Sequence, residues 1–136
     1  MKTVVLDTSV LIDHVHGFAH WLDPLLEDIE HNKLVVPTIA IAEYLTTQDA
    51  ETIEGFEKSK AFLDTFVKQD LTESIALVLG TLLRRKTHVP SASMGDLIIA
   101  STALHLGAPL ATTNTRDFAR IPQLHFFDPK TFAKYR

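Results

Sequence analysis

Four acidic side chains stand where an α/β protein could use them for metal-ion chemistry. Asp7 directly follows an apolar run, Asp96 opens an apolar segment, and Asp117 lies just beyond another apolar run. Glu43 interrupts the apolar segment TIAIAEYL, where a carboxylate is costly to bury unless it is paired, metal-bound or on a narrow exposed stripe. Mg²⁺ and Mn²⁺ prefer carboxylate oxygens as ligands. These four acids therefore form a candidate metal site.

A cluster of this kind predicts metal-assisted hydrolysis. Carboxylates packed together without cations would repel each other, and their pKa values would rise. One bound cation can activate a water molecule, and a second can stabilise the leaving oxygen. This chemistry requires no side-chain nucleophile, and thiol catalysis is excluded because the chain contains no cysteine.

Three of the acids also have ordinary structural interpretations. Asp7 could be a turn or capping residue at a strand-to-helix junction. Asp96 lies three residues after Ser93, which is the spacing of a capping box. Asn114 and Asp117 could likewise be a helix cap and its partner. The positions alone therefore leave both interpretations open.

The composition predicts one globular domain that spans residues 1–136. Apolar residues make up 46% of the 136 residues and charged residues 22%. A net charge of −4 argues against a broad basic surface for duplex binding, so a nucleic-acid substrate would need local contacts and bridging cations. The sequence shows no signal peptide and no membrane span, and the cytoplasm is the expected location.

The apolar patterning predicts strands that alternate with helices. The expected strands are Thr3–Leu6, Lys33–Val36, Pro109–Thr112 and His125–Phe127, with a further short strand near Asp70–Leu71. The expected helices are Leu11–Asn32, Ile39–Thr46, Ala50–Lys68, Glu73–Lys86 and Leu97–Leu106, followed by a helical turn at Thr115–Ala119. This order predicts an α/β fold with a mostly parallel central sheet of about five strands flanked by helices. Functional residues of such sheets gather at the carboxyl ends of the strands.

Two expected helices carry apolar stripes that predict core packing. The first stripe consists of Trp21, Leu22, Leu25, Leu26 and Ile29. The second consists of Ile53, Phe56, Lys60, Leu63 and Val67. Stripes on the helices between residues 50 and 86 could alternatively serve oligomerisation or the binding of a partner protein.

Four segments of the chain resemble the signature segments of PIN-domain nucleases. They are VVLDTSVLID, IAEYL, GDLIIASTAL and ATTNTRDF, in this order, and the resemblance extends from Thr3 to about Pro129. The chain length and the closing segment LHFFDP are also similar to those of small prokaryotic VapC-like toxins. The resemblance implies a parallel α/β sheet sandwiched by helices, in agreement with the patterning.

The resemblance also implies a site and an activity. An acidic quartet would bind Mg²⁺ or Mn²⁺, with Glu43 completing the ligand shell or orienting the attacking water, and it corresponds to Asp7, Glu43, Asp96 and Asp117. Ser9 matches a hydroxyl position near the first acid, and Asn114 a polar position before the last. Members of the family hydrolyse phosphodiester bonds in RNA. The toxins pair with an antitoxin protein that occludes the site, and homodimers or higher oligomers are usual.

Basic residues offer possible contacts to the substrate. Arg116 lies beside the proposed site and could bind a substrate phosphate. The only dense basic run consists of Arg84, Arg85, Lys86 and His88. This run could contact RNA, or it could be a solvated helix end that complements the helix dipole.

Other functions fit the sequence less well. A zinc site at His16 and His20 has Gly17 between the two histidines and no strong third ligand. A phosphatase with Asp7 as nucleophile would need a second acid at position 9, which is serine. A receiver-like phosphoacceptor lacks the paired acids. A non-catalytic interaction module and a housekeeping RNA-processing nuclease remain alternatives to a toxin.

Overall fold

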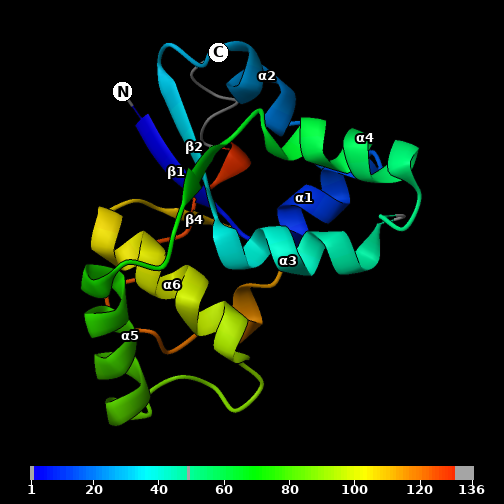
Figure 1. Cartoon of the computed structure of the whole chain (residues 1–136). Coiled ribbons are helices and arrows are strands. Elements are labelled where there is room, and N and C mark those ends of the chain that lie inside the picture. Colours follow the sequence, from blue (N-terminus) through cyan, green and yellow to red (C-terminus); the bar gives the residue numbers. More distant parts are fainter. Residues whose placement is uncertain (1, 49, 131–136) are drawn as a thin grey trace.

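The computed structural model describes residues 2–48 and 50–130, and among them a parallel sheet forms the centre (Figure 1). Its strands lie in the order β3-β2-β1-β4, and each pairs parallel to its neighbour. They are β1 (Lys2–Leu6), β2 (Asn32–Pro37), β3 (Val67–Gln69) and β4 (Leu110–Ala111). The order of connection reverses at β1, because β2 follows on one side and β4 pairs on the other.

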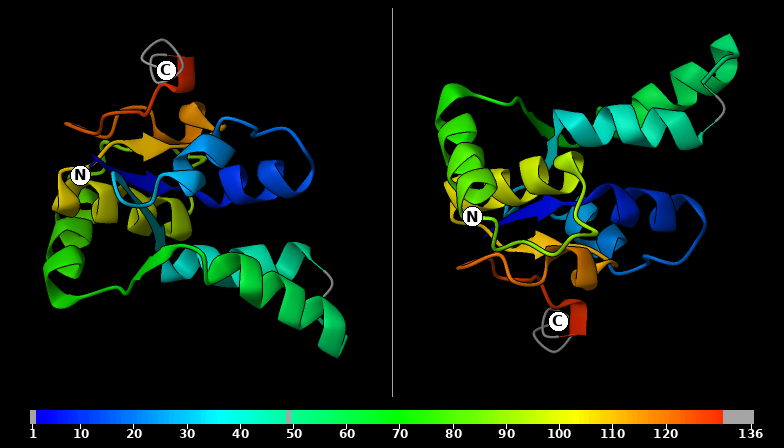
Figure 2. Two further views of the ribbon diagram at one scale, coloured as in Figure 1. Left: turned by 90° about the horizontal axis from the view of Figure 1, so that it is seen from above. Right: turned by 90° about the horizontal axis from the view of Figure 1, so that it is seen from below.

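Helices cover both faces of this sheet. They are α1 (Thr8–Val15), α2 (Leu22–Glu27), α3 (Thr38–Thr47), α4 (Ile53–Leu63), α5 (Glu73–Arg85) and α6 (Met94–Leu106), with a 3₁₀ turn η1 (Thr115–Phe118). Figure 2 shows α3, α5 and α6 on one face, and α2 with the segment after β4 on the other. Val4, Val5 and Leu6 of β1 are fully buried, because helices cover the sheet on both sides, as is usual for parallel sheets.

Helix α6 holds the layers together because it is apolar almost all round. Ile99 and Ala100 are fully buried, and the helix contacts β1, β2, α3 and α5. The side chain of Ser93 caps its beginning. Gly107 ends it at φ +61°, a conformation that favours glycine, so the predicted end of this helix at Leu106 is confirmed, whereas it begins at Met94 and not at Leu97.

The predicted helix Leu11–Asn32 is wrong, because the segment forms two short helices. Asp7 caps α1 with its side chain, so the helix already begins at Thr8. Gly17 adopts φ +81° and turns the chain between α1 and α2. The apolar stripe holds for the buried Leu22 and Leu25, but Ile29 lies beyond α2 and is 63% exposed.

The predicted helix Ala50–Lys68 is also too long. Thr52 caps α4, which ends at Leu63 before the chain enters β3. Leu63 is buried as predicted, whereas Ile53 is 79% exposed and Phe56 is also exposed. The stripe therefore packs into the core at one end of α4 and leaves an apolar surface at the other.

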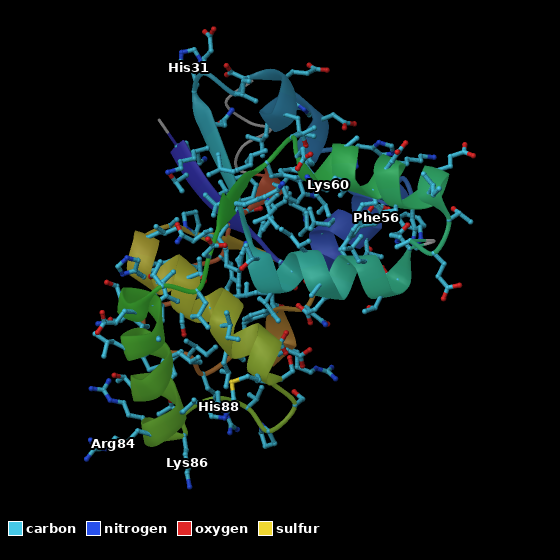
Figure 3. All side chains as sticks on the ribbon, viewed as in Figure 1. His31, Phe56, Lys60, Arg84, Lys86 and His88 are labelled. Atoms are coloured by element: carbon cyan, nitrogen blue, oxygen red, sulfur yellow. The ribbon has the colours of Figure 1, made fainter. Side chains whose placement is uncertain are left out.

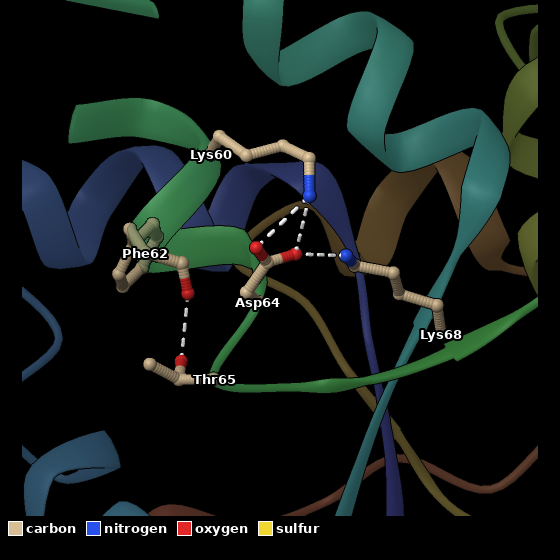
Figure 4. A network of polar contacts seen from close by, with 5 residues as sticks. All are labelled: Lys60, Phe62, Asp64, Thr65 and Lys68. Carbon is tan, nitrogen blue, oxygen red and sulfur yellow. Dashed lines mark hydrogen bonds and ion pairs between the residues drawn. The ribbon is translucent and has the colours of Figure 1, made fainter. Parts of the chain in front are cut away.

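A cluster of charges fixes the turn from α4 into β3 (Figure 4). The Asp64 carboxylate accepts hydrogen bonds from Lys60, at 2.9 Å, and from Lys68. Hydrogen bonds from both lysines hold the pKa of Asp64 below its ordinary value. The Thr65 hydroxyl donates to the carbonyl of Phe62 at 2.7 Å. The edge strand therefore begins at Val67 and not at the predicted Asp70–Leu71.

The predicted α/β class with a parallel sheet flanked by helices is confirmed. The sheet of the described residues has four strands in place of about five. The expected last strand, His125–Phe127, is reduced to one parallel bridge between Leu110 and Phe126. Within the described ranges, no helix is both long and apolar enough to cross a membrane.

Candidate active site

Asp7 lies at the carboxyl end of β1, beside the carboxyl end of its parallel neighbour β4. Its backbone N–H donates to the carbonyl of Ala111 at 2.9 Å, which joins the end of β1 to the end of β4. This is the point at which the strand order reverses, and ligands of open parallel sheets bind at such points. The sheet therefore positions Asp7 before any side chain contributes.

Hydrogen bonds orient both carboxylate oxygens of Asp7, which is 5% exposed. Oδ1 accepts from the backbone N–H of Thr8 at 2.8 Å. Oδ2 accepts from the hydroxyls of Ser9, at 2.7 Å, and Thr112, at 2.8 Å. Ser9 Oγ in turn accepts from the backbone N–H of Thr113 at 3.1 Å. The carboxylate is thus held between α1 and the segment that follows β4.

Burial raises the pKa of Asp7 above its ordinary value. The hydrogen bonds from Ser9 and Thr112 lower the pKa, and repulsion from Asp96 raises it further. Since burial outweighs the hydrogen bonds, the ionised carboxylate of Asp7 is destabilised in the absence of a cation.

Glu43 projects from the middle of α3 toward the same place. Its Oε1 accepts a hydrogen bond from the Thr8 hydroxyl at 2.9 Å. Burial raises the pKa of Glu43, and repulsion from Asp7 and Asp96 adds to the rise. The side chain is half-buried, so the apolar helix around it shields it only in part.

The start of α6 packs directly against the Glu43 carboxylate. A β-carbon at position 95 would lie 3.1 Å from Glu43 Oε2, and Gly95 has none. The absence of a side chain at Gly95 therefore lets Glu43 and the first turn of α6 approach each other.

Asp96 serves as a capping residue and also takes part in the acidic cluster. Its Oδ2 accepts from the backbone N–H of Ser93 at 2.9 Å, while its own N–H donates to Ser93 Oγ at 3.0 Å. The predicted capping box is confirmed. The same carboxylate repels both Asp7 and Glu43, so structural and electrostatic roles coincide in one side chain.

Asp117 is held by a serine that is remote in the sequence. Asp117 Oδ1 accepts from the Ser91 hydroxyl at 2.8 Å. The backbone N–H of Asn114 donates to Thr112 Oγ1 at 2.9 Å. The alternative in which the Asn114 side chain caps this turn is wrong, because η1 has no side-chain cap. Arg116 is exposed on the same turn.

The donor set suits a hard divalent cation. The side chains gathered here offer carboxylate and hydroxyl oxygens, which Mg²⁺ and Mn²⁺ prefer. Burial and mutual repulsion destabilise the charges of Asp7 and Glu43, and a cation would relieve both effects. Among the described residues, no three acidic or histidine side chains lie close enough together, as they stand, to hold a metal ion. The residues fit a cation by chemistry and charge.

Sequence reasoning missed three hydroxyl side chains that hold the acids. Thr8 bonds Glu43, Thr112 bonds Asp7, and Ser91 bonds Asp117. Hydroxyl residues beside Asp7 and in the segment TTN were a visible signal for the first two. Ser91 lies 26 residues before Asp117, and no local pattern connects them.

The premise of the zinc alternative is wrong. His16 caps the end of α1, and the chain turns at Gly17 before it reaches His20. The two histidines therefore do not share the face of one helix.

Comparison with known proteins shows the family. The model of the PIN domain matches residues 4–124. The chain belongs to the PIN domain family.

Its relatives and structural neighbours extend over nearly the whole chain. Ribonuclease VapC19 of Mycobacterium tuberculosis is 31% identical over 88% of this chain and 95% of its own length. Ribonuclease VapC10 of the same organism is 31% identical over 89% of this chain and 90% of its own length. A toxin–antitoxin complex from Klebsiella pneumoniae matches with a TM-score of 0.68 and 25% identity over 93% of this chain and 97% of that one. The DNA-bound VapBC of Salmonella typhimurium has the same fold, with a TM-score of 0.76, 20% identity and coverage of 95% and 99%.

Replacement of Glu43 by Gln should stabilise the metal-free protein above the ordinary carboxyl range. The raised pKa of Glu43 means that the native state loses stability as pH rises from about the ordinary value through the folded value. Gln keeps the acceptor for Thr8 and removes the charge. In EDTA at pH 8, Glu43→Gln should raise the thermal midpoint by roughly 1–3 °C, with a smaller difference at pH 4. A midpoint at pH 8 equal to or below that of the wild type would contradict the account.

Replacement of Gly95 by Ala should lower the catalytic rate and leave the rest of the fold intact. The added methyl group must displace the Glu43 carboxylate by a few tenths of an ångström. We expect kcat to fall about 3- to 10-fold on a cleavable RNA, because small misplacements of site groups are costly. The matched control is Gly80→Ala in α5, where a β-carbon meets nothing within 4 Å. The control should keep full activity, and its free energy of unfolding should rise by about 0.5–1 kcal/mol. Equal activity of the two variants would refute the positioning role of Gly95.

Proposed function

We propose that this protein is a divalent metal-dependent endoribonuclease that hydrolyses phosphodiester bonds in RNA and acts as the toxin of a type II toxin–antitoxin pair. One observation carries the proposal: at the point where the strand order reverses, the Thr8 hydroxyl beside Asp7 donates to Glu43 at 2.9 Å, and the first turn of α6, which carries Asp96, packs against Glu43. Membership of the PIN domain family and relatives named as ribonucleases support it.

In this proposal the acids bind Mg²⁺ or Mn²⁺ and the hydroxyl groups position the acids. The main ligands are Asp7, Asp96 and Asp117, while Glu43 completes the shell or orients the attacking water. The bound cation would supply a more acidic water and neutralise charge on the leaving oxygen. Ser9 and Thr112 keep both lone-pair directions of Asp7 Oδ2 occupied, and Thr8 fixes Glu43.

Arg116 would bind a substrate phosphate beside the acids. Its side chain is exposed on η1, directly before Asp117 in the sequence. Asn114 contributes its backbone N–H to the Thr112 hydroxyl, and its side chain is available for the substrate or for water. In this arrangement the acids hold the cations, and the arginine binds the negatively charged RNA backbone.

The partner would be a cognate antitoxin protein. The Klebsiella pneumoniae and Salmonella typhimurium neighbours are a toxin–antitoxin complex and a VapBC complex by name. An open groove of about 600 Å³ runs between α1, α3 and α4, where Val15, Tyr44 and Phe62 contribute to its lining. Exposed Ile53 and Phe56 on α4 add apolar area. A partner segment in this groove would contact α3 and α1, which carry Glu43 and the start of the site.

The proposal is tested by hydrolysis of a random-sequence single-stranded RNA pool with Mg²⁺ or Mn²⁺. Wild-type protein should cleave it, and EDTA should abolish cleavage. Asp7→Asn and Asp96→Asn should each lose activity by about 100-fold or more, since they alter groups that would hold the cation. Asp70→Asn removes an exposed acid outside the site and should keep wild-type activity. Full activity in EDTA, or undiminished cleavage by both site variants, would overturn the proposal.

A further inference from the structure

The charges of this chain are divided unevenly along its length. Fourteen of the 17 acidic residues lie in residues 1–73. Residues 74–127 contain only two acids, which are the site residues Asp96 and Asp117. The same segment carries five basic residues, Arg84, Arg85, Lys86, Arg116 and Arg120. The net charge of −4 therefore conceals a segment, residues 74–127, whose own net charge is positive.

The structure gathers three of these basic residues at the free end of α5. Arg84 and Lys86 project there next to His88, far from Phe56 and Lys60 on α4 (Figure 3). Arg84, Arg85 and Lys86 are all exposed. Lys86 adopts a left-handed conformation at φ +54°, which ends α5 and turns the chain toward α6.

One connecting loop joins this basic end to the acidic site. It leaves α5 at Lys86, and its Ser91 binds Asp117 at 2.8 Å before Ser93 caps α6. Five residues of extended chain span at most about 18 Å, which bounds the separation of Lys86 and Ser91.

We propose that single-stranded RNA approaches the acids over the α5–α6 loop, with its phosphates bound by Arg84, Arg85 and Lys86 and then by Arg116. This inference rests on the proposed function and names the path of its substrate. A single strand fits better than a duplex, because Asp7 is 5% exposed and a flexible strand can reach a buried group more easily than a rigid helix.

The approach over α4 offers a polyanion no net positive charge. The α4 segment carries Glu54 and Glu57 together with Lys58 and Lys60, and Glu51 precedes it. Glu54 and Lys58 both line the groove beside α4, whereas the end of α5 carries only basic charges. Interaction with the dipole of α5 can explain the basic residues at its end, but not Arg116 and Arg120, which lie outside this helix.

The test compares two charge-matched double variants. Arg84→Gln/Lys86→Gln removes two charges from the proposed path, and Lys33→Gln/Lys58→Gln removes two exposed charges from the acidic part. Binding of a fluorescein-labelled random-sequence single-stranded RNA pool is measured by anisotropy in EDTA, over a series of salt concentrations. The first variant should weaken binding about tenfold at low salt and reduce the slope of log affinity against log salt by about 0.7 for each phosphate that it no longer neutralises. The second should change affinity less than about twofold.

Cleavage kinetics separate failure of this path from failure of the proposed function. With Mn²⁺, the Arg84→Gln/Lys86→Gln variant should raise KM on the same RNA pool and leave kcat near the wild-type value. Wild-type cleavage with equal RNA affinity of the two double variants would overturn the path while the nuclease assignment stands. Absence of cleavage by the wild type would overturn the nuclease assignment, and binding in EDTA would still report on the path.

Discussion

The burial of carboxylates close to one another is the constraint on which the rest of this structure depends. Asp7, Glu43 and Asp96 come from the start of α1, the middle of α3 and the start of α6. Burial raises the pKa values of Asp7 and Glu43, and repulsion from Asp96 adds to both rises. A fold that assembles such groups must hold them against their repulsion. The parallel pairing of β1 with β2 and β4 supplies that rigidity, because it fixes the point from which α1 and the β4 segment depart.

Hydroxyl groups provide the second level of support. Ser9, Thr112 and Thr8 donate to the acids but carry no charge, so they orient carboxylates without neutralising them. A lysine in their place would satisfy the charge and leave less reason to bind a cation. The hydroxyl groups therefore orient carboxylate oxygens, which are the ligands that divalent cations prefer. Gly95 contributes by the lack of a side chain, since it lets α6 approach Glu43.

Much of this arrangement could be predicted from local patterns. The position of Asp7 at a strand end and of Glu43 in an apolar helix identified these two acids. The capping box around Asp96 followed from its spacing to Ser93. Gly17 could not be recognised as the break between α1 and α2, because the apolar spacing of the predicted helix continued past it. The exposure of Ile53 depends on where α4 packs, which no periodicity encodes. Contacts between distant segments, such as Ser91 with Asp117, require the three-dimensional fold. The roles of the four acids remain a prediction that rests on geometry and family membership.

The central claim is that the acidic cluster binds a divalent cation, and thermal unfolding with Mn²⁺ tests it most directly. A ligand that binds only the native state stabilises it by about 2.7 kcal/mol at a concentration of 100 times its Kd. The account predicts that Mn²⁺ raises the unfolding midpoint of the wild type and of Asp70→Asn, and that Asp7→Asn removes the rise. An equal rise in Asp7→Asn, or a wild-type midpoint that is the same in Mn²⁺ and EDTA, would contradict it.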